Sequence, residues 1–163
     1  MTKAPRPPQT PLPKLDQAPD AERRRAMAAV KGKDTKPERT VRRIAHGLGR
    51  RFRLHRKDLP GTPDLVFARD RKAVFVHGCF WHGHDCKRGA RTPKTNRAYW
   101  EAKIARNVAR DRAAIQALEA AGWTPLVVWE CETRDLEALT TRLRRFLVGE
   151  DGAREVGRLA SRE

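Results

Sequence analysis

The chain has 163 residues, which suits one domain with a single buried core, and no apolar run is long enough for a transmembrane helix. Its 36 Lys and Arg residues against 20 Asp and Glu residues give a formal charge of +16. A field of this sign attracts polyanions, usually nucleic acid, although a ribosomal or merely basic protein fits the charge equally well.

The N-terminal segment is predicted to be a disordered tail followed by a short helix. Residues 1–19 are basic, rich in proline and poor in apolar side chains, and they lack the apolar region of a signal peptide. We therefore expect a cytoplasmic protein with no membrane contact. Asp20 can cap a helix over residues 21–30 that ends at Gly32. Three consecutive side chains of this helix are expected to face phosphate or water: Arg23, Arg24 and Arg25.

The next stretch changes from helical to strand periodicity. Thr35 and Glu38 have the spacing of a capping box, and apolar residues then keep helical spacing as far as Gly47 or Gly49. Residues 51–55 alternate between basic and apolar side chains, as in a half-buried strand. Strands are also predicted at 64–68 and 73–77, joined by a polar turn.

The second half begins with a loop over residues 78–97, which is too long to lack a constraint. A helix from about 97 to 121 is capped by Gly122, and a buried strand covers 124–130. The last helix, 134–148, should turn its leucines inward, and residues 149–163 should fray. The order of elements indicates a mixed α/β domain over 20–148, with one central sheet flanked by helices. The leucines expected to face inward are Leu136, Leu139, Leu143 and Leu147.

The cysteines and a nearby histidine form a candidate structural zinc site. Cys79, His84 and Cys86 lie within eight residues of one another, and Cys131 follows the strand at 124–130. If that strand neighbours the one at 73–77, Cys79 and Cys131 meet, and three thiolates with one imidazole complete a tetrahedral zinc shell. His82 is an alternative fourth ligand and Asp85 a weaker one. Small buried cysteines without metal are the simpler alternative.

Catalytic residues are sought outside a filled zinc shell. Asp64 opens a strand after a sharp turn, and its carboxylate suits Mg²⁺, although an aspartate there can simply cap the turn. His77 and His82 are free to exchange protons near neutral pH. Glu38 is explained by the capping box, yet it also lies at a helix N-terminus that can steer phosphate.

Three aromatic side chains lie in polar surroundings. Phe80, Trp81 and Trp100 can stack on bases or wedge between base steps. The alternative is that they pack on the loop at 78–97, and for Trp100 the two interpretations are about even.

Four ordered motifs resemble the very short patch repair (Vsr) DNA mismatch endonucleases over residues 20–148. They are LPGTPDLVF from residue 59, VFVHGCFWHGHDC from 74, YWEAKIARNVARD from 99 and VVWEC from 127. The resemblance implies a restriction endonuclease-like fold and a Mg²⁺-dependent enzyme. Such an enzyme nicks one DNA strand 5′ of the thymine in a T·G mismatch that arises from deaminated 5-methylcytosine.

The resemblance also implies roles for individual residues. Asp64 and the backbone carbonyl of Val76 would bind Mg²⁺, His82 would act as general base and His77 would assist at the phosphate. Glu38 would complete the active site. The structural zinc would be held by Cys79, His84, Cys86 and Cys131, and the DNA wedge would be formed by Phe80, Trp81 and Trp100.

We therefore expect a monomeric bacterial enzyme, cytoplasmic and associated with the nucleoid, that starts mismatch repair. Its partners would be double-stranded DNA with a T·G mismatch and other DNA repair proteins. One alternative is a zinc-stabilised DNA-binding module without catalysis. A second is a relative with restriction-like activity on matched duplex.

Overall fold

The computed structural model describes residues 11–14, 32–91 and 93–149. At its centre lies a four-stranded sheet in the order β1-β2-β3-β4. The pairs β1–β2 and β2–β3 are antiparallel, whereas β3 and β4 are parallel. The predicted mixed sheet is therefore confirmed. The strands are β1 (Arg53–Leu54), β2 (Leu65–Phe67), β3 (Lys72–His77) and β4 (Thr124–Trp129).

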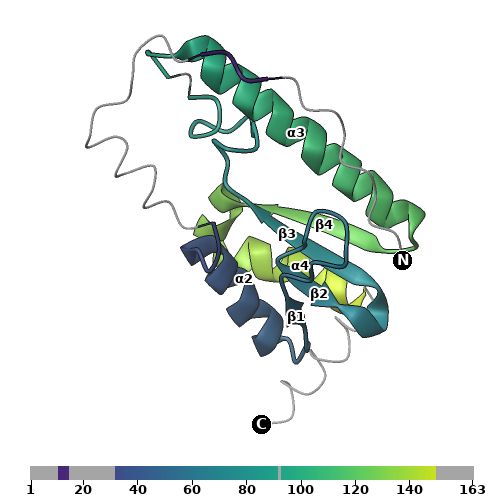
Figure 1. Cartoon of the computed structure of the whole chain (residues 1–163). Helices are drawn as coiled ribbons and strands as arrows, with labels where there is room; N and C mark the ends of the chain where they lie inside the picture. Colours follow the sequence, from purple (N-terminus) through teal and green to yellow (C-terminus); the bar gives the residue numbers. More distant parts are fainter. Residues whose placement is uncertain (1–10, 15–31, 92, 150–163) are drawn as a thin grey trace, which may run out of the picture.

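Helices cover both faces of this sheet. Helix α3 (Arg97–Ala120) lies along one face, and α2 (Lys36–Gly47) and α4 (Leu136–Val148) lie on the other (Figure 1). Two short 3₁₀ helices, η1 (Ala68–Asp70) and η2 (Glu130–Arg134), follow β2 and β4.

The central strands are apolar on both faces, so alternate residues enter two separate cores. Val74 and Val128 pack with α2 and α4, and the intervening Ala73, Phe75 and Val127 pack with α3. The α2–α4 core contains Val41, Ala45, Leu65, Phe67, Val74, Val128, Leu139, Leu143 and Leu147. Both faces are thus buried, and the residues at the strand ends are the ones left for chemistry.

Helix α2 begins where the sequence predicts. The Thr35 side chain accepts a hydrogen bond from the Glu38 backbone N–H, and the Glu38 carboxylate accepts one from the Thr35 N–H, which completes the capping box. Glu38 is nevertheless only 3% exposed. Its position is therefore more enclosed than a cap requires.

The parallel pairing of β3 and β4 brings their C-terminal ends together. His77 is in register with Trp129, so Cys79 and Cys131, two residues further along each chain, emerge at the same sheet edge. This confirms the adjacency on which the predicted zinc site depends. Asp64, just before β2, lies at this edge too because β2 runs antiparallel to β3.

Two predictions of buried side chains are wrong. Leu54 is 42% exposed because β1 is a two-residue edge strand, and Leu136 is 54% exposed in the first turn of α4. The predicted polar turn after β2 contains η1, and Arg71 then adopts a left-handed conformation with φ 50° before β3 begins at Lys72.

Some predictions concern residues that the structure does not describe. The helix at 21–30 lies outside the described ranges, as do both tails except residues 11–14 and Gly149, which are in neither helix nor strand. Among the described helices, none is long and apolar enough to cross a membrane.

Candidate active site and metal centre

Asp64 is held at the edge of the sheet by the turn before β2 and by β3. The turn depends on Gly61, which has φ +74° and whose Cα lies so close to α3 that a Cβ would come within 2.7 Å of the Ala114 Cβ. The Val76 backbone N–H donates a 2.7 Å hydrogen bond to Asp64 Oδ2. This bond fixes one carboxylate oxygen, while Oδ1 remains available for another partner.

The environment of Asp64 disfavours its charged form. Burial, and to a smaller extent the nearby Glu38 carboxylate, raise the pKa of Asp64 to about 6, against the opposing effects of the Val76 N–H, His55 and Arg42. A bound cation would offset this cost, because it stabilises the ionised carboxylate. The donor chemistry therefore fits Mg²⁺, which takes one or two carboxylates and other oxygen ligands.

His77 and His82 stack on one another. His77 directly follows Val76, the β3 residue that donates a hydrogen bond to Asp64. The ring centroids of the two histidines are 4.0 Å apart with planes inclined by 10°. His77 is 7% exposed, and burial lowers its pKa to about 4, so this ring is neutral at pH 7. A neutral buried imidazole can hydrogen-bond or exchange a proton, but it brings no fixed positive charge to phosphate.

Asp111 of α3 holds the second histidine. Its Oδ2 lies 2.5 Å from His82 Nδ1. Because the carboxylate accepts the Nδ1–H, the other ring nitrogen of His82 is left as the acceptor. This is the arrangement of a carboxylate-oriented general base.

Glu38, Arg42 and His55 form a second polar group beside Asp64. An Arg42 N–H donates to Glu38 Oε2 at 2.8 Å, and the same nitrogen lies 3.1 Å from His55 Nε2. His55 Nδ1 lies 3.7 Å from Asp64 Oδ1. The predicted Glu38 is therefore connected to Asp64 through two residues that the sequence did not single out.

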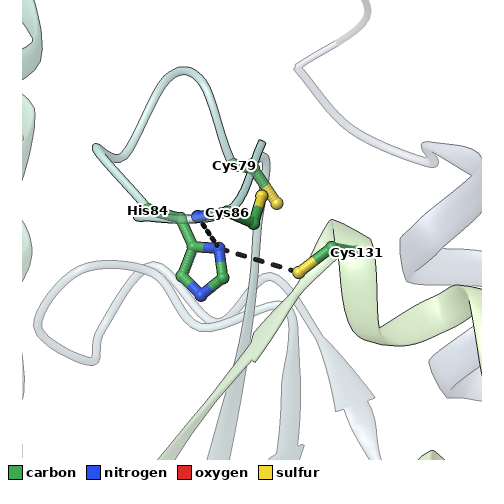
Figure 2. Close-up of side chains that lie close together, drawn as sticks. All are labelled: Cys79, His84, Cys86 and Cys131. Atoms are coloured by element: carbon green, nitrogen blue, oxygen red, sulfur yellow. Dashed lines mark hydrogen bonds between the residues drawn. The ribbon is translucent and has the colours of Figure 1, made fainter. Parts of the chain in front are cut away.

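The three cysteines and His84 converge at the end of the sheet. Cys79 and Cys86 come from the loop after β3, Cys131 comes from η2, and the donor atoms lie within 4.8 Å of one another (Figure 2). Asp85, the weaker candidate, is a 98% exposed side chain outside this cluster. His82 is also outside it, since its ring lies against His77 and Asp111.

The geometry of this cluster fits zinc. Cys131 Sγ and His84 Nδ1 are 3.6 Å apart. This matches the edge of about 3.6 Å expected in a tetrahedron with Zn–S of ~2.3 Å and Zn–N of ~2.1 Å. Burial raises the pKa of the Cys79 thiol to about 12, whereas the contact with His84 lowers the pKa of Cys86 to about 6. Only a cation would make three adjacent thiolates favourable together.

The loop that carries these ligands is tightly folded. The Gly89 N–H contacts Cys86 Sγ at 3.4 Å, and a Cβ on Gly89 would lie 2.0 Å from the His84 carbonyl oxygen. Only glycine fits there. The backbone thus fixes His84 and Cys86 in place without secondary structure.

The aromatic residues form a half-buried group between this loop and α3. The Trp81 and Trp100 ring centroids are 5.9 Å apart, with Phe80 against both. Lys103 Nζ lies 5.2 Å from the Trp100 ring and 5.5 Å from Trp81, which adds a positive charge to the aromatic face. These side chains pack on each other and are still partly exposed.

Three residues of the site were missed by sequence reasoning: Arg42, His55 and Asp111. None of them has a local motif of its own, although Asp111 ends the YWEAKIARNVARD segment. The only available signal was their type and their nearness to the other motifs. Arg23, Arg24 and Arg25 lie outside the described residues.

Comparison with known proteins identifies the family. The family model described as DNA mismatch endonuclease Vsr matches residues 15–88. The DNA mismatch endonuclease Vsr of Escherichia coli is 39% identical over 141 residues, which cover 83% of this chain and 90% of that protein. The chain belongs to the Vsr DNA mismatch endonuclease family.

Relatives and structural neighbours agree with this assignment. The type II nicking enzyme V.XorIIP of Xanthomonas oryzae pv. oryzae is 55% identical to this Vsr-family chain over 125 residues. These residues cover 77% of this chain and 91% of that enzyme. The catalytic domain of the homing endonuclease I-Bth0305I superposes with a TM-score of 0.50 at 18% identity, covering 71% of this chain and 96% of that domain. The fold is therefore that of the restriction endonuclease-like nucleases, and the protein is a DNA endonuclease of the Vsr family.

Proposed function

We propose that this protein nicks one strand of duplex DNA 5′ of the thymine in a T·G mismatch, using Mg²⁺, and so starts very short patch repair. The observation that supports this best is the approach of Asp64 and the His77–His82–Asp111 group to one end of the sheet. Membership of the Vsr family makes a mismatch the favoured substrate.

Asp64 and the backbone carbonyl of Val76 are the proposed magnesium ligands. When bound, Mg²⁺ supplies positive charge at the phosphate oxygens. Asp64 must be ionised for this role, and the Val76 N–H keeps its carboxylate in one orientation. Glu38 adds negative charge nearby, which increases the attraction for a cation.

His82 is the proposed general base. Asp111 accepts the Nδ1–H, so the Nε2 lone pair of His82 can take a proton from the attacking water. Asp111 then stabilises the resulting imidazolium. His77 stacks on His82, restricts its ring and assists at the phosphate as a neutral hydrogen-bonding group.

Zinc and the aromatic group have structural and recognition roles in this proposal. Zinc bound by Cys79, His84, Cys86 and Cys131 would hold the loop that carries His82 and the aromatics. Phe80, Trp81 and Trp100 would wedge into the duplex, where a mismatched step costs less to unstack than a paired one. The enzyme would act as a monomer, with the repair machinery as its partner.

Separating binding from nicking tests the enzymatic proposal against a DNA-binding module without catalysis. Asp64→Ala should abolish nicking of a T·G duplex in Mg²⁺ and should keep the binding of that duplex measured in Ca²⁺. Lys57→Ala, a change at an exposed residue outside the site, serves as the matched control. A wild-type protein that binds the mismatch and never nicks it would support the binding module.

A further inference from the structure

His55 is placed beside Asp64 by the backbone. The pairs Arg53–Val66 and Leu54–Leu65 fix the register of β1 and β2, and the His55 N–H then reaches the Asp64 carbonyl at 3.4 Å. His55 has φ 48°, a left-handed conformation that a non-glycine residue adopts at a local cost. The site therefore holds this imidazole against its backbone preference.

The tautomer of His55 follows from its neighbour Arg42. A guanidinium has only N–H donors, so at 3.1 Å His55 Nε2 must accept. The proton of the neutral ring is then on Nδ1, the atom that lies 3.7 Å from Asp64 Oδ1. That distance is too long for a hydrogen bond, and a movement of about 0.7 Å would close it.

The two oxygens of Asp64 thus face different groups. Val76 donates to Oδ2 from one side, and His55 presents its Nδ1–H to Oδ1 from the other. Arg42 is itself held by Glu38 at 2.8 Å and by an ion pair with Asp34. Asp34, Glu38 and His55 could form a metal site by distance, but the Arg42 guanidinium already contacts all three.

We propose that Arg42 and His55 are positioning residues that orient Asp64 for its metal. Arg42 fixes the Nδ1–H tautomer of His55, and His55 fixes the rotation of the Asp64 carboxylate. This inference rests on the proposed Mg²⁺-dependent function of Asp64, and it assigns roles to two residues that do not touch the reacting atoms. Partners of this kind that orient a ligand typically change metal affinity by about 10–100-fold.

Metal binding is the direct test, because it is measured without DNA and without turnover. Mn²⁺ would be titrated into the zinc-loaded full-length protein and followed by electron paramagnetic resonance, with Asp64→Ala identifying the signal of this site. His55→Leu should weaken Mn²⁺ binding at this site by about 10-fold or more. His55→Asn should recover most of the affinity, since its amide N–H lies near the position of Nδ1 and asparagine tolerates the left-handed conformation.

A second variant tests whether Arg42 acts through His55 and leaves the left-handed His55 itself unchanged. Arg42→Met should also weaken Mn²⁺ binding, and the double variant with His55→Leu should lose less affinity than the sum of the two single losses, because Arg42 acts in part through His55. His46→Leu, a change at an exposed histidine of α2, should leave binding unchanged. Nicking by His55→Leu should approach the wild-type rate at saturating Mg²⁺, with a raised half-saturating concentration.

Two outcomes would overturn the proposed positioning roles of Arg42 and His55. One is wild-type Mn²⁺ affinity in folded His55→Leu and Arg42→Met proteins. The other is a rate defect that saturating Mg²⁺ does not reduce. If the wild type binds Mn²⁺ through Asp64 and never nicks DNA, the proposed function fails. The metal titration then still tests whether Arg42 and His55 position Asp64.

Discussion

Replacing Asp64 by asparagine should stabilise the protein while it abolishes nicking. The side chain is 18% exposed, and burial raises its pKa from 3.8 to about 6. A raised folded-state pKa means that the folded protein prefers the protonated acid, so ionisation at higher pH lowers the free energy of unfolding. The shift corresponds to about 3 kcal/mol at pH 8, where Asp64 is ionised in both states.

The pH dependence separates this effect from a simple change in packing. By the same linkage the cost falls to about half at pH 5 and to less than 1 kcal/mol at pH 4. Asp64→Asn should therefore exceed the wild type in Tm by about 6–12 °C at pH 8, and the gap should narrow as pH falls. Asparagine can still accept the Val76 N–H, so that bond is kept.

Thermal and urea unfolding would be measured from pH 4.5 to 8 in magnesium-free buffer without chelators, so that other bound metal is undisturbed. His77 is present in both proteins, and its own titration cancels in the comparison. A variant that is less stable than the wild type at pH 8, or a gap that does not change with pH, would refute the account of Asp64 as a buried charge awaiting a cation.

Three further predictions concern the other groups of the site. Cys131→Ser should lower the zinc content per chain in metal analysis and should destabilise the loop after β3; full zinc occupancy would contradict the assigned ligands. Trp81→Ala should weaken T·G duplex binding by about 5–150-fold, the range for one lost base–aromatic stack, in a fluorescence anisotropy titration. Equal affinity would show that Trp81 only packs against Trp100. For His77, whose pKa is lowered to about 4, the neutral form stabilises the fold above pH 6.5, and this contribution is lost as pH falls toward 4. Wild type should thus lose up to about 3 kcal/mol more than His77→Gln over that range in urea unfolding, and parallel curves would exclude a buried neutral imidazole.

Local sequence patterns predicted the features that depend on residues close together in the chain. The Thr35–Glu38 capping box and the apolar strands follow from short-range signals. The approach of Cys79 to Cys131 was predicted only on the condition that β3 and β4 are neighbours, which they are. The choice between His82 and His84 did not follow, because both lie in the same loop. The backbone turn at Gly89 and the contact with Asp111 separate them.

The residues that were missed act across the fold. His55 reaches Asp64 only through the register of β1 and β2, and Asp111 reaches His82 from the middle of α3. A charged or polar side chain on a strand or a helix usually faces solvent. The sequence around His55 and that around Asp111 therefore gave no indication of a site. Leu54 and Leu136 were misplaced for the converse reason: periodicity predicts a buried face and does not show where neighbouring elements end.

We propose that the active site at the end of β3 nicks DNA beside a T·G mismatch, and paired duplexes test this directly. Two duplexes that differ only in T·G or T·A at one position, with the T strand labelled at its 5′ end, would be incubated with the protein and Mg²⁺. We expect a single cut on the T strand, immediately 5′ of the thymine, with the T·A duplex cut at least about tenfold more slowly. Equal cutting of both duplexes, or cutting of both strands, would contradict it and favour a restriction-like nuclease.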